Sequence, residues 1–163
     1  MFCGPSRSRL NAVAKSRRYL ATLGEQRLAV ATPEDRERLL NQIQQQAVVD
    51  LLVERERAHM VGFERLVYSA LGLGTKTDEP CVSLLRSGEH CALTFLTPSW
   101  GERRALDPAR KGMSGRVAFT LSTGESTSLD LSECLGVREA LAALSHFLEH
   151  GKRPGGLSYV NAN

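Results

Sequence analysis

The sequence predicts an α+β fold: N-terminal helices, then an antiparallel β-meander of four to five strands with one packed C-terminal helix. Two observations lead to this prediction. Apolar residues recur at helical spacing as far as Ala70, and beyond Pro80 they alternate with a period of two. A length of 163 residues, 42% of them hydrophobic, suits one domain or one domain with a helical extension.

Residues 72–80, GLGTKTDEP, separate the two patterns. Their glycines and closing proline are typical of a linker. We therefore expect a helical region over residues 1–74, with one or two long amphipathic helices. A module of sheet plus helix should follow over residues 79–163.

Residues 8–23 have the apolar spacing of a helix that Gly24 would stop. A second helix should begin where Thr32 can cap it and Pro33 suits its first position. Its apolar stripe comprises Leu39, Leu40, Ile43, Ala47, Val48, Leu51, Leu52, Met60, Phe63, Leu66, Val67 and Ala70. One helix from Thr32 to Ala70 satisfies this pattern, and so do two helices with a break near residues 57–62.

The alternating half begins with two strands, residues 81–85 and 91–96, which flank a hairpin-length turn at residues 87–89. Residues 100–114 form a polar loop in this interpretation. Two further strands, residues 116–122 and 126–131, then flank the turn Thr123-Gly124. Thr127 and Ser128 keep one face of this hairpin polar, as in a half-solvated antiparallel sheet.

Residues 137–150 carry the clearest helical pattern of the chain. One apolar face comprises Val137, Ala140, Leu141, Leu144, Phe147 and Leu148. Gly151 should end the helix, and Pro154 prevents its continuation. A short closing strand follows.

Charge and cysteine usage exclude several classes of protein. The net charge of +3 is too small to imply a nucleic-acid partner, and the basic residues 1–18 with their local +5 have little aromatic content beside them. No apolar run reaches the roughly 20 residues of a membrane span, and no secretory signal is evident. Four scattered cysteines without CxxC spacing indicate a reduced, cytoplasmic protein; a Cys81–Cys91 hairpin disulfide is the alternative.

No motif in the chain predicts catalysis, a cofactor or a metal. Residues 146–150 read H-x-x-E-H, but a catalytic zinc site needs a third protein ligand and only thirteen residues follow. The glycine pair Gly72 and Gly74 follows a helix, whereas a phosphate loop precedes one. No G-x-S-x-G is present, and the carboxylates form no convincing pair. We expect a protein that is not an enzyme.

The end of the chain has a distinctive sequence pattern. It runs Val137, Glu139-Ala140-Leu141, Phe147-Leu148, Gly151-Lys152-Arg153-Pro154 and Leu157-Ser158-Tyr159. With the two preceding hairpins, this segment resembles immunity protein family 1 of bacterial polymorphic toxin systems. The resemblance covers about residues 79–160, and Tyr159 stands where that family prefers Trp.

The resemblance implies a cytoplasmic protein that binds and blocks a cognate secreted toxin, often an enzyme acting on nucleic acid or protein. Exposed aromatic and charged residues near the loops are the expected contacts: Trp100, Glu102, Arg103, Arg104, Glu125 and Asp130. Trp100 fits a partly buried loop cap equally well. The alternative function is an adaptor or secretion chaperone that binds an exported effector without inhibiting it. The N-terminal helices would widen the interface, brace the sheet or form a homodimer.

Overall fold

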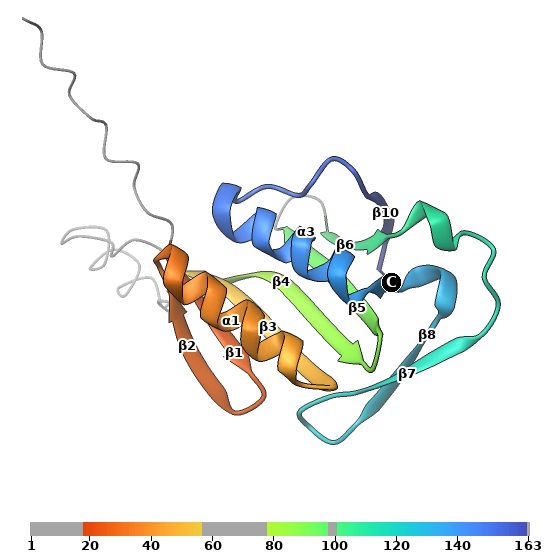
Figure 1. Ribbon diagram of the computed structural model, residues 1–163, viewed down its shortest axis with the longest axis horizontal. Coiled ribbons are helices and arrows are strands. Elements are labelled where there is room, and N and C mark those ends of the chain that lie inside the picture. Colours follow the sequence, from red (N-terminus) through yellow and green to blue (C-terminus); the bar gives the residue numbers. More distant parts are fainter. Residues whose placement is uncertain (1–17, 57–77, 98–100, 163) are drawn as a thin grey trace, which may run out of the picture.

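The computed structural model describes residues 18–56, 78–97 and 101–162 (Figure 1). One antiparallel sheet has the strand order β10-β6-β5-β4-β3-β1-β2, and the short β9 pairs with β5 beside this path. Its strands are β1 (Tyr19–Leu23), β2 (Gln26–Val30), β3 (Val48–Glu56), β4 (Asp78–Ser87), β5 (His90–Thr97), β6 (Gly101–Leu106), β9 (Leu135–Gly136) and β10 (Ser158–Asn161). Strands β7 (Arg116–Thr120) and β8 (Ser126–Asp130) form a separate two-stranded sheet.

Helices α1 (Pro33–Gln45) and α3 (Val137–His150) lie on the same face of the main sheet (Figure 1). The strands turn alternate side chains toward them, as the buried Tyr19, Ala21 and Leu23 of β1 illustrate. Phe147 of α3 packs against Tyr19 and Phe95 with tilted rings, whose centroids lie 5.8 and 5.4 Å from its own. The main core therefore lies between this helix pair and the sheet.

The expected start of the second helix is confirmed. Thr32 is the N-cap of α1, and its hydroxyl accepts a hydrogen bond from the backbone N–H of Asp35 at 3.1 Å. The Asp35 carboxylate accepts the N–H of Thr32 at 3.1 Å in return. This reciprocal capping box satisfies two backbone donors that a helix start leaves free.

The expected N-terminal helices are wrong over the described residues, because strands come first. Residues 19–23 form β1 and not the end of a helix; Gly24, at φ +57°, lies in the turn to β2. The helix expected to reach Ala70 ends at Gln45, and β3 follows at Val48. Valines and leucines there alternate between the two faces of the sheet, a pattern that also fits helical spacing over a short window.

Residues 8–17 and 57–77, on which the remaining helical predictions fall, lie outside the described residues. The boundary expected between residues 74 and 79 falls between β3 and β4, which pair over most of their length from Val48↔Ser87 onward. The residues before and after that boundary therefore contribute to one sheet.

The predicted strands and helix of the C-terminal half are present, but the expected meander of four to five strands is wrong. The strands β7 and β8 form a separate sheet, and the others belong to an eight-stranded sheet that includes β1, β2 and β3. The expected strands correspond to β4, β5, β7 and β8, and the expected helix is α3. Gly151 adopts φ +66° and donates its N–H to the Phe147 carbonyl at 2.6 Å, so it ends α3 as expected. The polar loop over residues 100–114 is wrong in part, because residues 101–106 form β6 between β5 and β10. No helix in the described ranges is long and apolar enough to cross a membrane.

Candidate protein-binding surface

The β7–β8 hairpin packs on the face of the main sheet that lies opposite the helices. Leu84 of β4 is buried in the main core, whereas its neighbour Leu85 contacts a second cluster built around Phe119 of β7. Successive strand residues point to opposite faces, so this second cluster lies on the other side of the sheet. Phe119 is completely buried there, together with Ala92 and Cys134.

A polar contact fixes the tip of the hairpin to the main sheet, because the Ser122 N–H donates to the Asp50 carboxylate of β3 at 2.7 Å. At the base, the Leu131 N–H donates to the Gly115 carbonyl at 2.8 Å, which closes the two strands on each other. The apolar anchor and the contact with Asp50 give the hairpin a defined position on the sheet.

The outward side of this hairpin is exposed along its whole length. We call it the hairpin face; it comprises Arg116, Ala118, Thr120, Ser126, Ser128 and Asp130. Arg116 Nε lies 3.8 Å from Asp130 Oδ1, and its Nη2 donates to the Ser128 carbonyl at 3.3 Å. Small and polar side chains therefore make up most of this face, and the Arg116–Asp130 ion pair lies at its base.

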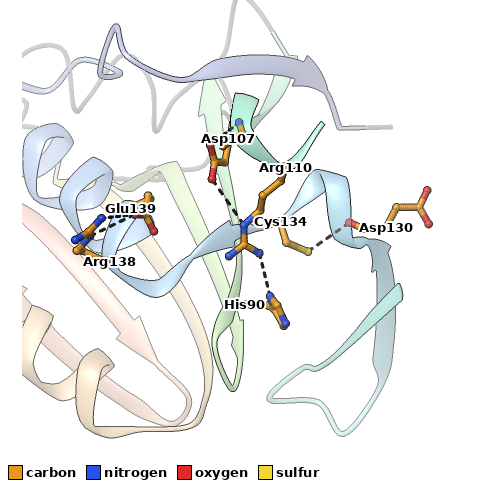
Figure 2. A network of polar contacts seen from close by, with 8 residues as sticks. His90, Asp107, Arg110, Asp130, Cys134, Arg138 and Glu139 are labelled. Atoms are coloured by element: carbon orange, nitrogen blue, oxygen red, sulfur yellow. Dashed lines mark hydrogen bonds and ion pairs between the residues drawn. The ribbon is translucent and has the colours of Figure 1, made fainter. Parts of the chain in front are cut away.

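A polar network lies beside the base of the hairpin (Figure 2). Arg110 ends the short 3₁₀ helix η1 (Pro108–Arg110), and its Nη1 lies 3.0 Å from Nδ1 of His90. Its Nε lies 3.7 Å from the Asp107 carboxylate. Because arginine only donates hydrogen bonds, Nδ1 of His90 must accept here. Arg110 thereby ties the loop before β7 to the start of β5.

The start of α3 lies next to this network, at its N-cap residue Gly136. A Cβ at Gly136 would collide with the Glu139 carboxylate and stand 3.3 Å from Nη2 of Arg110. Glycine therefore lets both side chains approach the backbone. The Glu139 carboxylate lies in the first turn of α3, where negative charge favours the helix dipole.

The surroundings of Cys134 disfavour its thiolate form. Its thiol donates to the Asp130 carbonyl at 3.5 Å (Figure 2), and burial raises its pKa. The thiolate is the reactive form of cysteine, so a raised pKa lowers the reactivity of this side chain. The contacts of Arg110 in the network join the loop before β7 to β5.

The five predicted contact residues that the structure describes lie on two elements, three on β6 and two in the β7–β8 hairpin. Trp100 lies outside the described residues. Glu102, Arg103 and Arg104 lie on β6, where Arg103 binds the Asn161 side chain and Arg104 Nη1 lies 3.2 Å from Glu133 Oε1. With a side-chain exposure of 16%, Arg104 has little surface to offer a partner.

Glu125 and Asp130 belong to the hairpin, at its turn and at its base. The predicted polar face of this hairpin was wrong in part, because the consecutive residues Thr127 and Ser128 point to opposite sides and only Ser128 lies on the hairpin face. The small residues of that face were not among the predicted contacts. The alternation of residues 116–120 and 126–130 was the signal that could have identified the face.

Comparison with known proteins adds no assignment. Neither a scan against protein-family models nor a search of curated proteins finds a match to this chain. Among the described residues, no group of three or more histidine, cysteine or acidic side chains is arranged to hold a metal ion.

Proposed function

We propose that this chain is a cytoplasmic immunity protein, which binds a cognate secreted bacterial toxin through the hairpin face and blocks it by direct contact without catalysis. The observation that carries the proposal is the hairpin itself. A short exposed strand pair, held on the sheet by a buried aromatic residue and by the hydrogen bond from Ser122 to Asp50, is a preformed surface. Preformed surfaces lose less conformational entropy when a partner binds.

The packing of the C-terminal motif supports the resemblance behind this proposal. The Tyr159 hydroxyl donates to the Pro154 carbonyl at 2.6 Å, and the Arg153 guanidinium lies 4.7 Å from the centre of the Tyr159 ring. Phe95 of β5 meets the same ring edge-on at 6.0 Å. The Arg-Pro pair and the closing aromatic residue thus form one packed unit, which gives their spacing in the sequence a structural reason.

Size sets a requirement for this interface. A stable complex buries about 800 Å² on each partner, more than one side of a five-residue strand pair offers. The flanking turns must therefore contribute a rim. Glu125 and the exposed Met113, in the loop before β7, are suited to that role.

The test begins with a pull-down of the tagged full-length chain from its native lysate. A stoichiometric partner should come down that is toxic when expressed alone and is silenced by this chain. A partner that stays fully active in the complex would instead indicate the adaptor or secretion chaperone.

Two matched variants then locate the interface. Ala118→Glu places a carboxylate on the hairpin face, and Ala142→Glu places one on the exposed side of α3. We expect Ala118→Glu to weaken binding more than about tenfold, a loss of more than about 1.4 kcal/mol, and to abolish rescue from the toxin. Ala142→Glu should leave both unchanged. Equal effects of the two variants would contradict the assignment to the hairpin face.

A further inference from the structure

The last turn of α3 presents two imidazole rings side by side. His146 and His150 are four residues apart, and their ring centroids are separated by 4.5 Å with an interplanar angle of 55°. Residues at this spacing lie one above the other on a helix surface. The buried Phe147 and Leu148 take the side of the helix that faces the core, so the histidine pair lies away from it.

His150 is exposed to solvent, and His146 is partly buried. The His150 side chain is 52% exposed, and the neighbouring Glu149 is 57% exposed. Glu149 Oε2 lies 3.8 Å from Nε2 of His150, which places a negative charge beside the pair. A cation can therefore reach His150 directly from solvent, and the partly exposed His146 ring lies beside it.

We infer that His146 and His150 form a two-histidine site for a borderline divalent metal ion such as Zn²⁺. Zinc binds imidazole nitrogen at about 2.0–2.1 Å, and in tetrahedral geometry two such nitrogens are about 3.3 Å apart. Rings with centroids 4.5 Å apart can present one nitrogen each at that separation after small side-chain rotations. Imidazole is a preferred ligand of Zn²⁺, Cu²⁺ and Ni²⁺.

Two protein ligands define what kind of site this is. Structural zinc sites use four protein ligands and catalytic sites use three, so this pair leaves at least two positions to water. The ion should bind reversibly and more weakly than in a closed site. Because it would link two turns of α3, it should also stabilise the C-terminal end of that helix.

The experiment is a titration of the full-length chain with zinc chloride, followed by calorimetry and by NMR of the imidazole nitrogens. Cys3→Ser serves as the background, since a free thiol also binds zinc. We expect one ion per chain, with resonance shifts confined to His146 and His150. His146→Asn and His150→Asn should each weaken binding more than about tenfold. His59→Asn should have no effect.

Two results would overturn the inference. One is the absence of binding up to millimolar zinc. The other is binding that persists in the double variant His146→Asn/His150→Asn. Circular dichroism of that variant checks that α3 remains folded, and the NMR shifts of the unmodified rings test the site without any substitution there.

Discussion

Arg86 of β4 completes the last turn of α1: its Nη1 lies 2.7 Å from the carbonyl oxygen of Ile43. The same nitrogen donates to the Gln44 carbonyl at 3.0 Å, and Nε donates to the Gly88 carbonyl at 2.8 Å. Arg86 is only 7% exposed, and α1 has no basic residue of its own in its last turn. A strand residue thus supplies the positive charge and the donors that a helix C-terminus needs.

Replacement of Arg86 by methionine should lower the unfolding free energy by about 3 kcal/mol, because three carbonyl oxygens lose a charged donor. Of these, the Ile43 carbonyl keeps only a long hydrogen bond of 3.4 Å from the Gln46 N–H. Arg86→Lys should cost less, since it keeps the charge but loses the forked geometry. Urea unfolding measures both. Arg38→Met, on the exposed side of the same helix, is the control and should cost less than about 0.5 kcal/mol. Equal losses for Arg86→Met and Arg38→Met would contradict this role.

This contact also explains why the end of α1 escaped prediction. The residues that start α1, Thr32 and Pro33, lie at the helix itself, whereas its end is stabilised by Arg86, a residue of β4. The end of α3 is local again, at Gly151, and was predicted correctly. Sequence patterns therefore located those helix ends whose signals lie within the helix or next to it.

Of the strands that were missed, which also include β2, β3 and β9, β1 and β6 escaped prediction for different physical reasons. β1 has only five residues with apolar side chains on both faces, and so short a run fits helical and strand periods alike. β6 is rich in charge and buries only Ala105; its arginines contact Asn161 and Glu133, which are distant in sequence. The strands of the hairpin face were predicted, but their place on the sheet depends on contacts with Asp50 and Leu85 that no local pattern encodes.

Asp35 should make the stability of the chain depend on pH. Backbone N–H donors of Thr32 and Ala31 hold the pKa of its carboxyl below the ordinary value of 3.8. As pH falls, the unfolded chain therefore takes up the proton first. The stabilisation is complete above the unfolded pKa and is lost as pH falls through the lower folded pKa.

Asp35→Asn removes this titration and provides the measurement. Urea unfolding should show the parent chain more stable than Asp35→Asn near about pH 6, with the difference shrinking by about pH 2.5. Glu37→Gln, on the same helix, should lower the stability less than Asp35→Asn near about pH 6, because Glu37 takes no part in the capping box. A difference between the parent chain and Asp35→Asn that stays constant with pH would contradict the role of the capping carboxylate.

Phe119→Ala should loosen the β7–β8 hairpin without unfolding the main sheet. Phe119 is completely buried, but its packing partners belong to the small second cluster and not to the main core. Loss of a buried phenylalanine costs about 3–5 kcal/mol, so amide protection in the hairpin should fall at least about a hundredfold. Hydrogen exchange measures this, with Leu93 of β5 as the internal reference. A uniform loss across both sheets would show that hairpin and sheet unfold as one unit.

Cys81 and Cys91 should resist modification as long as the chain is folded. Burial raises the pKa of each thiol to about 12, and Cys81 also donates to the Val53 carbonyl at 3.1 Å. Thiolate is the reactive form, so almost none is present near neutral pH. In a Cys3→Ser background, a disulfide reagent should label Cys81 and Cys91 no faster than the chain unfolds in urea. Ser128→Cys, on the exposed hairpin face, should react at once in the same assay. Rapid labelling of Cys81 or Cys91 in the native chain would contradict their burial.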